Sequence, residues 1–102
     1  MKLDTMKLQM LFKKEWLDRI TSKENENRIT IDLHSLSCRD AEKLIKDTIA
    51  LTRGEYIMEV IHGYNNGTAL KETIINHKIS NRISNRRSPS WNPGVTELAI
   101  AA

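Results

Sequence analysis

Three side chains that can do acid–base chemistry stand at the carboxyl ends of two apolar segments of the chain. Asp32 and His34 are two residues apart at the end of the segment 28–33, and His62 follows the segment 56–61. Side chains two apart on a strand point the same way. If the two segments are neighbouring parallel strands, the carboxylate and both imidazoles gather at one edge of the sheet, where ligands bind in open α/β sheets.

The residues after His62 add groups that suit a phosphate. Gly63 and Gly67 let a phosphate approach the backbone closely, and a helix beginning at Thr68 offers unpaired N–H groups to an anion. A carboxylate, two imidazoles and a helix N-terminus are the parts that phosphodiester chemistry uses. Each part also has a purely structural interpretation, in a turn or at a strand end, so the combination is more informative than any member.

The charge of the chain is unevenly distributed. Lys and Arg number 16 against 13 Asp and Glu, but no acidic residue occurs between Glu72 and Glu97. A locally unopposed basic segment suits a phosphate-bearing partner, and a solvated basic loop is the alternative. The residues expected to contact DNA or RNA are Gly63, Asn65, Asn66, Gly67, Thr68, Lys71, Arg82, Arg86 and Arg87.

The apolar pattern predicts an α/β domain behind an N-terminal helix. Residues 2–20 favour a helix, the polar residues 21–27 are typical of a linker, and residues 28–102 form the domain. Two successive βα units imply neighbouring parallel strands with right-handed crossovers. We therefore expect a two-layer βαβαββ sandwich with a four-stranded mixed sheet. Its elements are a strand at 28–33, a helix capped by Ser37 and ended by Gly54, a strand at 56–61, a helix at 69–77, a strand at 79–84, a loop at 86–94 and a strand at 95–100.

Length and composition narrow the class of protein further. A chain of 102 residues, 39% hydrophobic and 28% charged, suits one globular core. No apolar run approaches the roughly 20 residues that span a bilayer, and the charged N-terminus lacks the apolar core of a signal peptide. We therefore expect a cytoplasmic protein with no membrane partner. The single cysteine, Cys38, excludes an internal disulfide and a cysteine-rich zinc site, and we expect it to be structural.

Three motifs resemble those of the Smr (small MutS-related) domain family. Ile-Asp-Leu-His-Ser-Leu-Ser at 31–37 resembles the Asp-Leu-His-Gly-Leu run that closes the family's first strand. Val-Ile-His-Gly at 60–63, followed by Gly-Thr-Ala-Leu at 67–70, resembles the second signature, His-Gly-x-Gly and then Gly-x-Leu. Asn-Pro-Gly-Val-Thr at 92–96 resembles the turn before the last strand. The resemblance covers about residues 28–101.

This resemblance implies a fold, a ligand class and an activity. The fold is a small α/β sandwich like the C-terminal domain of bacterial translation initiation factor three. Family members bind branched or structured DNA, or RNA, and several are metal-assisted endonucleases. In this chain Asp32 would be a metal ligand or general base, His62 an acid–base or phosphate-holding group, and His34 would orient the phosphate or complete the site. A single carboxylate on its own binds Mg²⁺ or Mn²⁺ weakly. The ion would therefore also need oxygen ligands from the substrate phosphates, or cleavage would proceed without a metal.

The sequence also departs from the family pattern. Ser35 stands where the family has Gly, and Asn65 or Asn66 stands where the second loop has another Gly. Asn tolerates left-handed backbone geometry, but Ser35 favours an alternative, a module that binds nucleic acid without cutting it. A third hypothesis is an interaction protein that docks, or self-associates, through its N-terminal helix. DNA and RNA, and the oligomeric state, stay open at this point.

Overall fold

The order of elements is known for most of the chain, since the computed structural model describes residues 1–63, 68–89 and 91–102. In these ranges a five-stranded mixed sheet has the order β2-β3-β5-β7-β6, and β1 and β4 form a two-stranded sheet. The elements are β1 (Lys2–Leu3), α1 (Thr5–Leu11), α2 (Lys14–Leu17), β2 (Ile20–Lys23), a 3-10 turn (Glu24–Glu26), β3 (Arg28–Asp32), α3 (Cys38–Ala50), β4 (Thr52–Arg53), β5 (Tyr56–Ile61), α4 (Thr68–Asn76), β6 (Ile83–Arg87) and β7 (Val95–Ile100).

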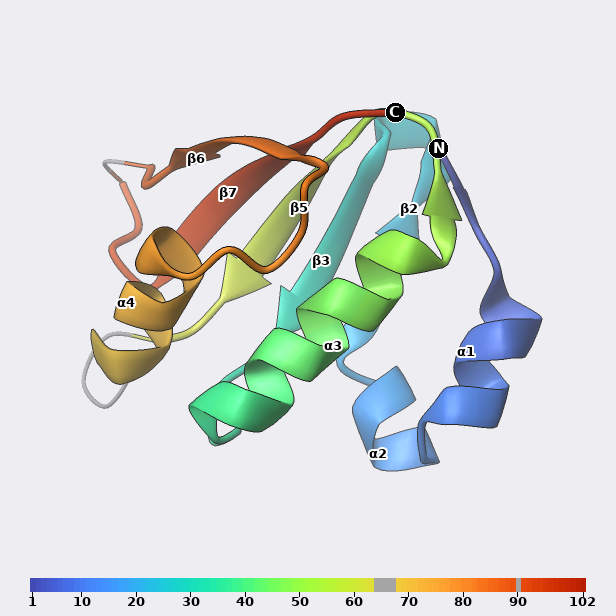
Figure 1. Ribbon diagram of the computed structural model, residues 1–102, viewed down its shortest axis with the longest axis horizontal. Coiled ribbons are helices and arrows are strands. Elements are labelled where there is room, and N and C mark those ends of the chain that lie inside the picture. The colour runs from blue at the N-terminus through green and yellow to red at the C-terminus, as the bar shows by residue number, and fades with distance from the viewer. Residues whose placement is uncertain (64–67, 90) are drawn as a thin grey trace.

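The centre of the sheet has the predicted parallel pair. β3 and β5 are parallel, with Asp32 opposite Ile61, and α3 makes the crossover between them. β7 then pairs antiparallel with β5, and β6 pairs antiparallel with β7. Figure 1 shows α3 and α4 on the same face of the sheet, so the two-layer α/β architecture is confirmed.

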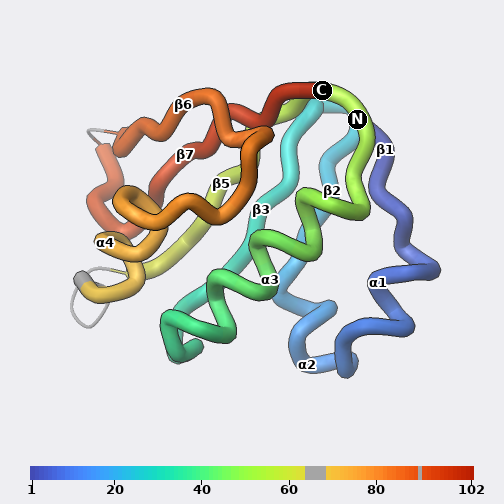
Figure 2. The backbone as a smooth tube through the Cα atoms, viewed as in Figure 1, coloured from blue at the N-terminus to red at the C-terminus, as the bar shows by residue number. Residues whose placement is uncertain are grey.

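Alternation along the strands explains which face the helices cover. Ile29 and Ile31 of β3, and Met58 and Val60 of β5, are fully buried under the helix layer, while their sequence neighbours are half-buried. α3 buries one stripe against them and starts as predicted, because the Ser37 hydroxyl accepts a hydrogen bond from the backbone N–H of Asp40 at 3.1 Å. This packing places the carboxyl ends of β3 and β5 at the end of the molecule away from both termini (Figure 2).

The N-terminal segment differs from the prediction. The expected single helix over residues 2–20 is wrong, because the chain leaves α1 in an extended conformation at Phe12, which is buried and stacks on Trp16 at 5.4 Å between ring centroids. The expected linker contains β2, an edge strand paired with β3, so the large sheet has five strands and not four. Asn27 closes this hairpin with a left-handed φ of 54°. The predicted domain boundary at residue 28 falls inside the hairpin.

Two further boundaries also differ. α3 is capped at Leu51, and Gly54 instead forms the turn into β5 with a φ of +87°. The strand expected at 79–84 is displaced to β6, so Arg86 and Arg87 lie in a strand and not in a loop. Ile79 is buried in the core, which fixes the chain ahead of β6 in an irregular conformation. α4 agrees with the predicted helix to within one residue at each end.

The sheet face opposite the helices carries a row of charges. Arg28 on β3 bonds to Glu59 on β5 at 3.3 Å and also to Glu97 on β7. Arg87 on β6 bonds to the same Glu97 at 2.5 Å. The hydrogen bond from Arg87, together with Arg28, lowers the pKa of the Glu97 carboxyl below its ordinary value, and the bond to Glu97 raises the pKa of Arg28. These pairs tie four strands together across this face.

Candidate functional site

Asp32 and His34 form a pair on the surface at the end of β3. Asp32 Oδ1 accepts a hydrogen bond from the backbone N–H of His34 at 3.1 Å and lies 3.3 Å from His34 Nδ1. The two side chains are 44% and 67% exposed. The pair therefore offers an oriented imidazole to solvent at the sheet edge where the sequence placed it.

The turn that presents His34 is held from the preceding hairpin. Arg19 Nη1 donates to the carbonyl oxygens of Asp32 at 3.0 Å and His34 at 2.8 Å. Ser35 has a φ of +70°, a left-handed conformation that favours glycine. The position where the family motif has Gly thus requires a left-handed backbone conformation, which Ser35 adopts at a cost in free energy. Arg19 was missed from the sequence, since nothing in the segment 2–20 signals a contact to Asp32.

His62 lies at the same end of the sheet, but its side chain points the other way. It is in phase with Met58 and Val60, and it is 2% exposed under the helix layer. Its Nδ1 lies 2.7 Å from the carbonyl oxygen of Gly63, and its Nε2 lies 3.0 Å from Thr96 Oγ1. A carbonyl only accepts, so Nδ1 carries the proton and the Thr96 hydroxyl donates to Nε2. Burial lowers the pKa of His62, which keeps the ring neutral near pH 7.

The backbone of the three predicted residues therefore meets at one end, as expected, while their side chains separate. Asp32 is opposite Ile61, the residue before His62, so alternation sends Asp32 and His62 to opposite faces of the sheet. Only Asp32 and His34 share an exposed surface. A role for His62 in acid–base chemistry stays a prediction. Its buried ring lacks the exposure that such chemistry needs.

Gly63 is fixed by a close approach of two loops. The backbone N–H groups of His62 and Gly63 both donate to the carbonyl of Gly94, at 2.9 and 3.1 Å. A Cβ on Gly94 would lie 3.4 Å from the Gly63 Cα, and Gly63 itself has a φ of +72°. The Gly63 N–H is thus already hydrogen-bonded within the protein. The predicted contacts Asn65, Asn66 and Gly67 lie outside the described residues, and so does the side chain of Thr68.

The three arginines expected to hold phosphates are bonded within the protein. The Arg82 guanidinium donates to four main-chain carbonyls at 2.6 to 2.9 Å, those of Ile49, Thr52, Gly54 and Ala101. Arg86 donates to the carbonyls of Ile74 and His77, and Arg87 is paired with Glu97. These bonds give each arginine a structural explanation. Their contact with nucleic acid, like that of the half-buried Lys71, stays a prediction.

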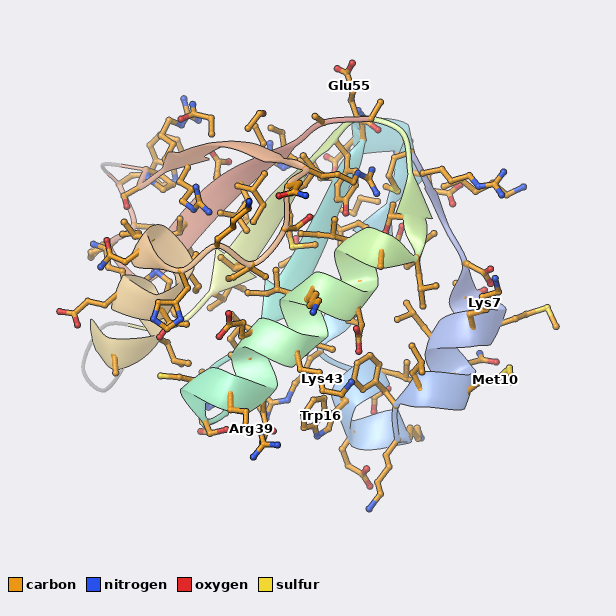
Figure 3. All side chains as sticks on the ribbon, viewed as in Figure 1. Lys7, Met10, Trp16, Arg39, Lys43 and Glu55 are labelled. Carbon is orange, nitrogen blue, oxygen red and sulfur yellow. The ribbon has the colours of Figure 1, made fainter. Side chains whose placement is uncertain are left out.

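A different set of cations is exposed on and next to α3, the helix that follows the Asp32–His34 pair in the chain. Arg39, Lys43 and Lys46 lie on one face of α3 at positions i, i+4 and i+7, and Figure 3 shows Arg39 and Lys43 there. Lys46 and Lys78 line the same open groove of about 420 Å³. Within the described ranges Lys43 pairs with Asp47 at 2.8 Å, whereas the other three have no carboxylate within 4.0 Å. We call Arg39, Lys43, Lys46 and Lys78 the α3 basic face.

The donor set does not fit a resident metal ion. Among the described residues, no group of three or more His, Cys, Asp or Glu side chains is placed to hold one. Asp32 and His34 supply two ligands, and Asp32 Oδ1 is already engaged. A Mg²⁺ or Mn²⁺ ion here would take most of its six ligands from substrate phosphates and water.

The comparisons with known proteins agree on the fold alone. No family model matches the sequence, and no curated protein matches it either. A solved structure does match, the Smr domain of Thermus thermophilus MutS2, with a TM-score of 0.59 and 22% sequence identity over 72% of this chain and 98% of that chain. This chain has the fold of an Smr domain. The Smr resemblance seen in the motifs is thereby confirmed at the level of structure.

Two surface features complete the description of this Smr fold. In the described part of the chain, no helix has the length and apolar character needed to cross a membrane. Met6, Met10 and Leu11 of α1 are exposed, and Figure 3 shows Met10 pointing away from the rest of the molecule. Self-association through this segment stays a prediction.

Proposed function

We propose that this chain is a nucleic-acid-binding domain whose Asp32–His34 pair cleaves RNA. The observation that carries the proposal is the exposed His34 ring, held by Asp32 at the carboxyl end of a central parallel strand. Ligands bind at this edge in open α/β sheets. The Smr fold of the chain supports the same function, since the motif around Asp32 and His34 is the one that resembles the family.

The geometry of the pair suits a general base. Asp32 Oδ1 accepts from Nδ1–H of His34, which leaves Nε2 with a free lone pair on an exposed side chain. Nε2 removes the proton from a ribose 2′-hydroxyl, and the 2′-oxygen then attacks the adjacent phosphorus. The bond from phosphorus to the 5′-oxygen breaks, and the leaving oxygen takes a proton from the imidazolium or from water. The products are a 2′,3′-cyclic phosphate and a 5′-hydroxyl.

RNA is favoured over DNA by this chemistry. RNA carries its own nucleophile next to the scissile phosphate, so one oriented imidazole removes the only proton that the attack requires. DNA lacks the 2′-hydroxyl and would need a positioned water as well. Since His62 is buried and neutral, the described residues place one exposed imidazole at this site and not two.

The α3 basic face supplies the charge that a nucleic-acid backbone requires. α3 begins four residues after His34, so Arg39 is in its first turn, and Lys46 and Lys78 continue the surface toward the other end of the helix. Phosphate contacts by Lys and Arg account for most sequence-independent affinity. The proposed path therefore runs along α3 and leaves Arg82, Arg86 and Arg87 in their internal contacts.

The test is incubation of the purified chain with single-stranded RNA, with and without EDTA, followed by analysis of the new ends. We expect cleavage in both conditions and 2′,3′-cyclic phosphate ends. Binding without cleavage would instead support the non-catalytic module, which the strained Ser35 favours. Absence of both binding and cleavage would overturn the proposal.

A further inference from the structure

The Trp91 side chain is exposed to solvent in the folded protein. It is 75% exposed, whereas Phe12 and Tyr56 are buried and Trp16 is half-buried against Phe12. Among the aromatic side chains that the structure describes, Trp91 alone is mostly exposed. An indole has a large apolar surface, so burying it against a ligand would be favourable.

The turn that presents Trp91 is fixed on both sides. The backbone N–H of Asn92 donates to the Pro89 carbonyl at 3.2 Å, and the Asn92 side chain accepts from the N–H of Gly94 at 3.0 Å. The Gly94 carbonyl in turn holds the backbone of His62 and Gly63. Trp91 is therefore attached, through this network, to the carboxyl end of β5.

The position of Trp91 relates it to the Asp32–His34 pair. β7 begins at Val95, opposite Ile61, so the turn before β7 lies at the same sheet end as the end of β3. One strand separates β3 from β7, and two strand spacings amount to about 10 Å. A nucleic-acid strand that crosses this end of the sheet passes both features.

The segment that carries Trp91 contains no acidic residue that would repel a polyanion. No acidic residue occurs between Glu72 and Glu97, and Glu97 is buried and bonded to Arg28 and Arg87. The segment that carries Trp91 thus brings no free carboxylate to repel phosphates. A flat, exposed indole in such a setting stacks on a base of any identity, provided that the base is unpaired.

We infer that Trp91 is a stacking platform for an unpaired base of a bound single strand. The inference rests on the proposed function and deepens it, because it defines the substrate as nucleic acid with unpaired bases. A duplex keeps its bases stacked inside and offers Trp91 only its outer surface.

The experiment uses the full chain with Trp16→Phe as the parent, so that Trp91 is the sole tryptophan. Binding of a single-stranded DNA 12-mer, which lacks the 2′-hydroxyl and is not cleaved, of a DNA duplex of equal length and of an abasic DNA 12-mer is measured by Trp91 emission and by anisotropy of a label on the oligonucleotide. We expect the single strand to quench Trp91, and Trp91→Ala to weaken its binding about 5- to 150-fold. Trp91→Phe should restore most of the affinity.

The abasic strand is the matched control, since it keeps the phosphates and lacks the bases. Trp91→Ala should leave abasic and duplex binding, and the salt dependence of all three, unchanged. Equal single-strand affinity of Trp91→Ala and the parent would overturn the inference and leave the proposed function standing. A change in sedimentation of Trp91→Ala without a change in binding would also overturn it, in favour of a protein contact. A parent chain that binds none of the three ligands would overturn both.

Discussion

His34 Nδ1 lies 3.3 Å from Asp32 Oδ1, and the same oxygen accepts the backbone N–H of His34 at 3.1 Å. One carboxylate oxygen therefore contacts both the ring and the backbone of the residue two positions later. This is possible because β3 ends at Asp32 and the chain turns at Ser35, whose φ is +70°. The shape of the turn, and not the two residue types alone, creates the pair.

Ser35→Gly is expected to stabilise the protein. A left-handed conformation costs a residue with a Cβ roughly 1–2 kcal/mol, part of which glycine returns through its greater freedom in the unfolded chain. We expect the free energy of unfolding in urea to rise by up to about 1 kcal/mol. Ser37→Ala, which removes the cap of α3, should lower it by about 1 kcal/mol. A loss of stability in Ser35→Gly would contradict the assigned strain.

Arg82→Ala is expected to destabilise the fold rather than to weaken binding directly. The guanidinium satisfies four carbonyls that join α3, β4 and the C-terminal residues, and its loss leaves them without their donor. We expect a loss of about 3 kcal/mol or more in urea unfolding. Arg39→Ala, which removes an exposed arginine, should change stability by less than about 0.5 kcal/mol. Similar values for the two variants would show that the Arg82 contacts contribute little.

Removal of the α3 basic face is expected to weaken binding to every sequence alike. The triple variant Arg39→Ala, Lys46→Ala and Lys78→Ala should lower the slope of log affinity against log salt by about 2, at about 0.7 per phosphate contact with a single strand. The control triple Lys2→Ala, Lys7→Ala and Arg53→Ala loses equal charge from the exposed groove beside β1 and β4. An equal change in both triples would mean that only net charge matters.

His62 is expected to make the fold sensitive to mild acid. Burial lowers its pKa in the folded state below the ordinary 6.5, so the unfolded chain binds its proton first as the pH falls. Stability from this group is complete above about pH 6.5 and declines below it, whereas Glu97, with a lowered pKa, acts below about 4.5. Urea unfolding at pH 7.5, 6.5 and 5.5 should show the decline in the wild type. His62→Gln should lack this component, and an equal decline in both would contradict the neutral buried ring.

Much of the central fold could be predicted from the sequence, because hydrophobic periodicity and the succession of βα units are local signals. The sequence did not reveal β2, since Ile20–Lys23 is a polar edge strand that depends on pairing with β3 and on the left-handed Asn27. It also misplaced β6, whose start depends on distant carbonyls bonded by Arg82 and on the burial of Ile79. Such long-range contacts leave no mark in the spacing of residues.

The site was found in part for similar reasons. The strand-end positions of Asp32 and His34 follow from local pattern, and the structure brings them together. The burial of His62 could also have been predicted from the sequence, because His62 continues the alternation of Met58 and Val60. The internal contacts of Arg86 and Arg87 could not have been predicted, since a run of charged residues does not show which carbonyls or carboxylates lie opposite it.

The central claim is tested most directly by the rate of cleavage of one single-stranded RNA, with EDTA present, by wild type, His34→Ala and Asp32→Asn. His77→Ala, which removes an exposed histidine paired with Glu42, is the matched control. We expect His34→Ala to lower the rate by about 10²–10⁴ with affinity almost unchanged, Asp32→Asn to lower it as well, and His77→Ala to match the wild type. Cleavage by His34→Ala at the wild-type rate would contradict the account, because the pair at the end of β3 would then not be the site of the reaction.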